Sequence, residues 1–122
     1  MLYISNLVPS RPPMLIRLYN TSSTSIRISW QRLAPEYVHG ILRGYRVLYR
    51  LVNVTENVFK SLTTQELFVD LRGLLKYTNY GIRVLAFTTI GDGLTSAEHV
   101  CRTDQDGKKI NFKYCIFIFL NG

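Results

Sequence analysis

Hydrophobic and polar residues alternate along several short stretches of this chain. Ile26, Ile28 and Trp30 are separated by polar side chains, and Tyr45 and Val47 repeat the pattern further on. A period of two places successive side chains on opposite faces, which is typical of a half-buried β-strand. Trp30, the only tryptophan, ends its stretch and is predicted to lie at the centre of the core.

The same pattern predicts seven strands, and no stretch has helical periodicity. The expected strands span residues 14–19, 25–30, 42–51, 58–62, 67–71, 80–87 and 96–103. Turn signals separate them, the strongest being Gly91-Asp92-Gly93. The chain is therefore predicted to be all-β, as a seven-stranded antiparallel sandwich of the immunoglobulin-like type.

The stretch that begins at Tyr80 shows the clearest alternation, and Leu74 precedes it by six residues. Two interpretations are open: a tyrosine corner, in which the hydroxyl bonds to the backbone upstream, or an ordinary core tyrosine. The regular strands around this stretch favour the corner. The residues predicted to build the core are Trp30, Tyr45, Val47, Leu74, Tyr80 and Val84.

Composition and charge limit the class of protein. The 122 residues suffice for one domain with one modest core. Apolar residues make up 47% and charged residues 19%, which indicates a globular chain. The net charge is +7, and residues 8–104 hold twelve Lys or Arg against seven Asp or Glu. This balance is compatible with an acidic glycan or a lipid surface and demands neither.

No segment predicts membrane insertion. None reaches the roughly 18 apolar residues of a spanning helix, and the first ten residues lack the basic start and apolar run of a secretory signal. We also expect no nucleic-acid partner.

The sequence offers no catalytic constellation. His39 and His99 have no neighbouring nucleophile pattern and are interpreted as ordinary surface or edge residues. Cys101 and Cys115 lack the spacing of a zinc site; Cys101 is predicted to be a small core residue, and whether either forms a disulfide stays open. We expect no catalytic residue, no metal and no cofactor.

Two sequons are candidate N-glycosylation sites. Asn20-Thr21-Ser22 and Asn53-Val54-Thr55 both fall in predicted turns, where a glycan is accessible. The alternative is chance, because the motif is short. Their position favours an extracellular glycoprotein.

Taken in order, these residues resemble a fibronectin type III domain from about Val8 to Asp104. The features that carry the resemblance are Pro12-Pro13, Trp30, the segment 44–50, Leu74 to Tyr80, Ala86-Phe87, the Gly91-Asp92-Gly93 turn and Arg102-Thr103. Lys76 departs from the family, which usually has proline there. The two ends of the match resemble the junctions between tandem domains of this family in cell-adhesion receptors and receptor-type tyrosine phosphatases. These ends are Val8-Pro9-Ser10 and Arg102-Thr103-Asp104.

The resemblance implies where the domain ends. Residues 8–104 are expected to form the domain, residues 1–7 a flanking segment, and residues 105–122 a basic and then apolar tail outside the fold. The flanks are interpreted either as read-through at exon borders or as a real short tail.

The resemblance also implies a surface patch. In this fold the strands of Tyr45 and Tyr80 are neighbours, so their outward residues lie side by side. The members of this patch are Arg46, Leu48, Arg50, Arg83, Leu85 and Phe87. It is either a solvated strand face or a contact for a protein partner or a sulfated glycan.

The function expected from the resemblance is a non-catalytic interaction and spacer module, from the extracellular part of a cell-surface adhesion or receptor protein. Its partners would include neighbouring domains of the same parent chain. One alternative is an intracellular module of the sarcomeric kind, which the lack of a signal peptide and a free cysteine would favour. Others are an extracellular module of a receptor tyrosine phosphatase whose catalytic domain lies elsewhere, and an enzyme, for which no clustered acid, base or nucleophile is present.

Overall fold

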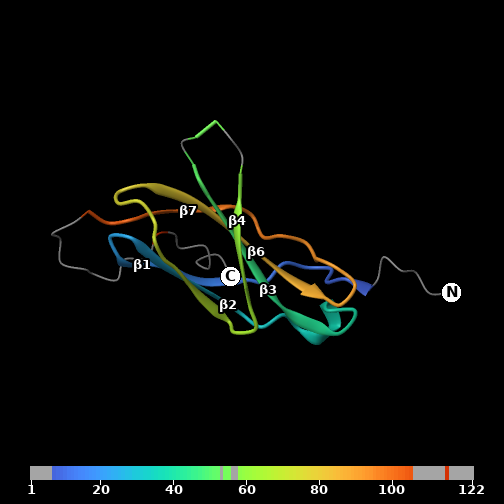
Figure 1. The fold of residues 1–122 in the computed structure, drawn as a ribbon. Coiled ribbons are helices and arrows are strands. Elements are labelled where there is room, and N and C mark those ends of the chain that lie inside the picture. Colours follow the sequence, from blue (N-terminus) through green and yellow to red (C-terminus); the bar gives the residue numbers. More distant parts are fainter. Residues whose placement is uncertain (1–6, 53, 56–57, 106–114, 116–122) are drawn as a thin grey trace.

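The structure is a computed structural model that describes residues 7–52, 54–55, 58–105 and 115. Its described part contains seven strands, in the number that the alternation predicts. They are β1 (Leu15–Ser22), β2 (Ser25–Trp30), β3 (Leu42–Leu51), β4 (Lys60–Thr64), β5 (Phe68–Leu71), β6 (Asn79–Thr88) and β7 (His99–Arg102). A short 3-10 helix, η2 (Pro35–Tyr37), lies between β2 and β3 (Figure 1).

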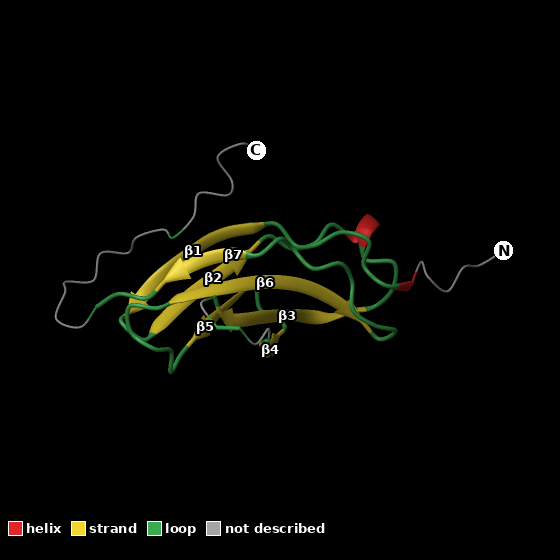
Figure 2. Ribbon diagram, turned by 90° about the horizontal axis from the view of Figure 1, so that it is seen from above, coloured by secondary structure: helices red, strands yellow, loops and turns green. Residues whose placement is uncertain are grey.

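The strands form two antiparallel sheets that pack face to face. One sheet has the order β1-β2-β5, and the other has the order β4-β3-β6-β7. Figure 2 shows β1 and β3 in opposite layers of the molecule. The predicted all-β antiparallel sandwich is confirmed.

Three strands differ from the prediction by more than one residue at one end or both. β1 continues to Ser22 because the polar residues after Tyr19 pair with β2, and the hairpin turn needs only Ser23 and Thr24. β4 lies two residues later than the segment 58–62, and β7 is confined to His99–Arg102. Alternation locates a strand well, but its ends depend on which neighbour it pairs with.

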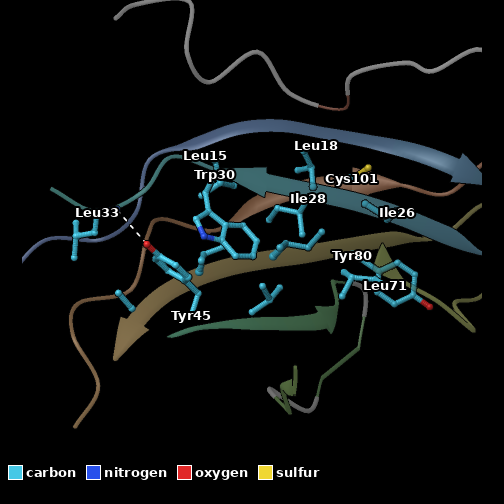
Figure 3. Packing of buried hydrophobic residues seen from close by; sticks show 14 of the residues in the cluster. Leu15, Leu18, Ile26, Ile28, Trp30, Leu33, Tyr45, Leu71, Tyr80 and Cys101 are labelled. Carbon is cyan, nitrogen blue, oxygen red and sulfur yellow. Dashed lines mark hydrogen bonds between the residues drawn. The ribbon is translucent and has the colours of Figure 1, made fainter. Parts of the chain in front are cut away.

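The core lies between the two sheets (Figure 3). All six residues that the pattern assigns to the core are buried, with Trp30 at 1% and Tyr45 at 2% exposure. The Trp30 and Tyr45 rings are 5.5 Å apart, a distance typical of a stabilising aromatic pair. The Tyr45 hydroxyl accepts a 3.2 Å hydrogen bond from the backbone N–H of Leu33, which holds the β2–β3 connection against the sheet.

Tyr80 forms the corner that opens β6. Its hydroxyl accepts a 2.7 Å hydrogen bond from the backbone N–H of Leu75. Leu74 is buried, and its N–H donates to the carbonyl of Thr24 at 2.9 Å. The segment before β6 is thus bonded both to β6 and to the β1–β2 turn. It forms these contacts although Lys76 stands where the family usually has proline.

Two residues outside the predicted domain limits contact the sandwich. The carbonyl of Leu7 accepts a 2.8 Å hydrogen bond from Oγ1 of Thr88. Cys115 forms a disulfide with Cys101 of β7. The sequence left open whether either cysteine forms a disulfide, and the structure pairs the two with each other.

Candidate functional site

The candidate surface is the outer face of β3 and β6, which pair along their length. Leu48 lies opposite Arg83, Arg46 opposite Leu85, and Arg50 opposite Gly81. Directly opposed residues of an antiparallel pair share a face of the sheet. The side chains of β3 and β6 that point away from the core therefore alternate between cationic and apolar groups.

Acidic side chains from the β6–β7 connection neutralise two of the three arginines. Arg50 donates two hydrogen bonds to Glu98, at 2.6 and 2.8 Å, and Arg46 donates one to Asp92 at 2.5 Å. The Arg50–Glu98 side chains are only 20% and 18% exposed, whereas the Asp92 side chain is 48% exposed. The Arg50–Glu98 pair is thus the more rigid of the two, since bidentate geometry fixes both groups.

Glycine at position 81 makes the Arg50–Glu98 pair possible. A Cβ atom added to Gly81 would meet the Glu98 carboxylate. The hydrogen bonds from Arg50 lower the pKa of Glu98 below its ordinary value and raise the pKa of Arg50. At neutral pH both groups are therefore charged, and together they contribute no net charge to the face.

Aromatic rings support the guanidinium groups. Arg46 lies 4.6 Å above the ring of Phe87, and Arg50 and Arg83 lie 5.6 and 5.9 Å from the ring of Phe59. These distances fall in the range of cation–π attraction. The rings restrain the arginines, so the face presents a preorganised array of flat cationic groups.

Arg83 differs from the other two arginines. It has no ion pair with another described residue, and its Nε is buried without a hydrogen-bond partner. Three arginines against two carboxylates leave the face with one net positive charge from these groups. Its electrostatic attraction for a polyanion is therefore weaker than the three arginines alone imply.

One predicted member of the patch is not accessible. Leu85 points outward from β6, but it is only 4% exposed. Its assignment as an apolar contact beside the arginines is therefore wrong, whereas Leu48 and Phe87 are partly exposed. Phe59, Asp92 and Glu98 also belong to the face, but they lie outside β3 and β6, so the alternation within these two strands could not identify them.

The two candidate glycosylation sites differ. Asn20 lies in β1 and not in a turn, and it is 4% exposed. Its Nδ2 donates a 2.8 Å hydrogen bond to the carbonyl of Arg102, so this nitrogen is not available for a glycan in the folded domain. Asn53 lies outside the described residues.

A second bidentate ion pair lies on the other sheet. Arg27 of β2 donates two hydrogen bonds to Asp70 of β5, at 2.7 and 2.8 Å, and stacks 4.7 Å from the ring of Phe68. The hydrogen bonds from Arg27 lower the pKa of Asp70 and raise that of Arg27. The pair joins neighbouring strands and is a structural clamp on the outer face of the three-stranded sheet.

The described part of the chain holds no group of three His, Cys, Asp or Glu side chains able to bind a metal ion. Within the same residues, no helix is both long and apolar enough to cross a bilayer. His39 lies 2.9 Å from the Ser10 hydroxyl on an exposed loop, and His99 is a half-buried edge residue of β7. Burial lowers the pKa of His99, so this residue is neutral at physiological pH.

Comparisons with known proteins agree with this geometry. The chain is 46% identical over 101 residues to the cell adhesion molecule DSCAM of Rattus norvegicus and 38% identical over 103 residues to the cell adhesion molecule Dscam2 of Drosophila melanogaster. Each match covers 81% of this chain, but this chain spans only 5% of the length of each relative.

Solved structures share the fold. The third fibronectin III domain of the human KIAA0343 protein superimposes with a TM-score of 0.76 at 21% identity, covering 91% of this chain and 95% of that one. The family model described as fibronectin type III domain matches residues 11–102. This chain belongs to the fibronectin type III family.

Proposed function

We propose that this domain is a non-catalytic interaction and spacer module in the extracellular part of a cell adhesion protein. The observation that carries the proposal is the 46% identity to DSCAM over 101 residues, which is 81% of this chain. The Cys101–Cys115 disulfide supports an extracellular location, because disulfides persist in oxidising compartments and are rare in the cytosol. The same bond argues against the intracellular sarcomeric alternative.

An antibody raised against the folded chain tests this location without knowledge of the partner. We expect it to label intact, unpermeabilised cells that express the parent protein. Labelling only after permeabilisation would contradict the proposal and favour the sarcomeric alternative. A mass shift of the parent fragment after glycosidase treatment, abolished by Asn53→Gln but not by Asn20→Gln, would identify Asn53 as the glycosylated sequon.

The end of the sandwich where β7 finishes is suited to a neighbouring domain. Leu75 and Tyr77 are 59% and 52% exposed there, and Arg102 stacks 4.4 Å from the Tyr77 ring. The N–H of Tyr77 donates to the carbonyl of Asp104 at 3.2 Å, so the chain leaves the domain beside these apolar side chains. A following domain of the parent chain would cover them, which is the usual cause of exposed apolar clusters.

The outer face of β3 and β6 is the proposed binding surface for a partner outside the parent chain. Its arginines are held by rings and carboxylates, so little side-chain entropy is lost on binding. A protein partner that presents a carboxylate next to apolar groups would match the single unpaired charge of Arg83 and the partly exposed Leu48. A sulfated glycan is the second candidate, favoured only by the net positive charge of the chain.

Heparin chromatography separates these two candidates. If the glycan is the ligand, retention on heparin should fall in Arg83→Ser. It should rise in Asp92→Asn and Glu98→Gln, which each remove one negative charge and free Arg46 and Arg50, respectively. Elution of all four proteins at the same low salt concentration would exclude the glycan and leave the protein contact. Residues 8–106 serve as the parent, because Lys108, Lys109 and Lys113 would add a non-specific contribution.

A further inference from the structure

The core of the sandwich is open at the end where β6 begins. Four residues face inward along β3, and in chain order they are Tyr45, Val47, Tyr49 and Leu51. The first two are buried, whereas the last two are only half-buried. Leu51 pairs with Tyr80 of β6, so this end is the one opposite to Tyr45 (Figure 3). Inward-facing apolar side chains therefore remain partly uncovered at one end of the core.

A cavity of about 600 Å³ occupies this end. β3, β4 and their connection contribute to its lining from one sheet, and residues 72–75 contribute directly after β5 of the other. Leu74 in this lining is buried and Leu75 is 59% exposed, so the cavity reaches from the core to the surface. Its volume and its mainly apolar lining are typical of sites that hold small molecules.

Two cationic side chains belong to the same lining. Lys60 stands opposite Tyr49 in the β3–β4 ladder, so both side chains lie on the inner face of the sheet. Lys60 forms no ion pair with another described residue. Arg72 is 77% exposed at its side chain and lies 3.4 Å from Asp70, a carboxylate that Arg27 already binds with two hydrogen bonds. Both cations are thus available to an anion at the opening of the cavity.

The described lining as a whole is positively charged. None of the described residues that line the cavity is acidic, and the remaining cation, Arg50, is neutralised by Glu98. A lysine on an edge strand also discourages pairing with other strands. That role requires neither an apolar cavity beside Lys60 nor a second cation at Arg72. The combination instead matches a ligand with an apolar body and a negative group.

We propose that this cavity binds a single-chain amphipathic carboxylate, such as a fatty acid anion. The apolar chain covers the half-buried surface of Tyr49 and Leu51 and removes it from water. The carboxylate binds Arg72, whose planar guanidinium can donate two hydrogen bonds, and Lys60, which adds a point charge. Lys60 and Arg72 are not part of the outer face of β3 and β6, so this site does not depend on the function proposed for that face.

Three probes separate the contributions of the chain and the head group. Decanoate, held below its micelle concentration, is added to the 15N-labelled full-length chain, and we expect saturable shifts of the Gly73 and Leu75 amide signals. The amide of Trp30, at the other end of the core, serves as the reference. Decyltrimethylammonium has the same chain and the opposite charge, and it should bind about fivefold or more weakly, because each exposed ion pair contributes little. Acetate, the head group without the chain, should cause no shift at the same concentration.

Variants assign the head group to its partners. Lys60→Gln and Arg72→Gln should each weaken decanoate binding about two- to fivefold. Arg17→Gln is the matched control, because it removes one exposed cation from the outer face of β1 and should leave the affinity unchanged. Leu75→Glu places a negative charge in the lining and should abolish binding, whereas the uncharged Leu75→Gln should retain most of it.

The head-group comparison uses the unmodified chain, so it holds even if a variant does not fold, which the dispersion of its amide signals reports. Equal affinity for decanoate and decyltrimethylammonium would overturn the proposal, because it would show that the apolar chain alone directs binding. Shifts that do not saturate, or a Lys60→Gln, Arg72→Gln double variant that binds decanoate like Arg17→Gln, would overturn it as well.

Discussion

At the scale of the residue, two buried tyrosines use their hydroxyls differently. Tyr80 accepts a 2.7 Å hydrogen bond from the N–H of Leu75, whereas the bond that Tyr45 accepts from Leu33 is 3.2 Å long. Tyr80→Phe removes only the hydroxyl, and we expect it to cost about 1–3 kcal/mol because a backbone group loses its partner. Urea denaturation of this variant and of the matched Tyr45→Phe measures both values. A loss for Tyr80→Phe that is no larger than that for Tyr45→Phe would show that the corner does not stabilise the domain.

Trp30 is the second residue whose replacement should strongly lower the stability of the domain. Its side chain is 1% exposed, among the largest groups in the core, and packs against Tyr45. Trp30→Ala is expected to cost about 3–5 kcal/mol through lost burial and the cavity left behind. For a small domain this is a large share of the total stability, so circular dichroism at 37 °C should show a mostly unfolded chain. Melting within a few degrees of the wild type would contradict this role.

The residue scale also shows what alternation can and cannot predict. Alternation places Trp30 and Tyr80 inward, because a strand of period two has only two faces. It cannot reveal that Asn20 is buried, because this residue is satisfied by the carbonyl of Arg102, which lies 82 positions away. Nor can it pair Arg50 with Glu98, since the carboxylate comes from a connection whose path depends on the folded β6–β7 edge. Such contacts are properties of the fold and not of local sequence.

At the scale of the element, each sheet carries one bidentate pair of an arginine and a carboxylate among the described residues. These pairs are Arg27–Asp70 and Arg50–Glu98. Asp70 and Glu98 both have pKa values lowered by hydrogen bonds from arginine. A group with a lowered pKa in the fold adds stability above its unfolded pKa, and this stability is lost as the pH falls through the folded value. The free energy of unfolding should therefore decrease below about pH 4.5, near the ordinary pKa of a glutamate.

Urea titrations between pH 2 and 6 measure this decrease. Asp70→Asn should flatten the curve, because the amide does not titrate. Asp92→Asn is the control: Asp92 forms a half-exposed ion pair, which solvent and salt screen, so its replacement should change the slope less. An identical slope for wild type and Asp70→Asn would contradict the role of the Arg27–Asp70 clamp.

His99 of β7 adds a separate step at higher pH. Burial lowers its pKa, so the unfolded chain binds a proton more readily than the folded one. Stability should therefore fall as the pH drops below about 6.5, the ordinary pKa of histidine. Chemical denaturation at pH 7.5 and 5.5 detects this step, which should disappear in His99→Gln. Its persistence in that variant would assign the step to another group.

At the scale of the whole molecule, the predicted domain limits can be tested by truncation. A chain of residues 8–106 retains all seven strands but lacks Cys115. We expect it to melt close to the reduced full-length chain, because its strands and core cluster lie within these limits apart from Cys115. It should also be more soluble, since the uncharged apolar run 115–120 is removed. Failure of this fragment to fold would show that the C-terminal segment belongs to the domain.

The topology of the sandwich is the level at which the sequence is most informative. Seven alternating stretches with turn signals leave few arrangements other than two antiparallel sheets. The neighbourhood of β3 and β6 followed from the family resemblance and not from alternation, because strand order depends on long-range pairing. The bond of Cys115 to Cys101 of β7 could not be anticipated, since two cysteines 14 residues apart carry no local signal of their pairing.

The disulfide between Cys101 and Cys115 also determines how the molecule would carry tension. With the bond closed, a pull applied beyond Cys115 passes through two sulfur atoms directly into β7, and the intervening segment bears no load. With the bond open, the same pull would reach β7 only through the main chain between the two cysteines, which are 14 positions apart. A single covalent bond thus determines whether tension enters the sandwich through the side chain of Cys101 or through the end of β7.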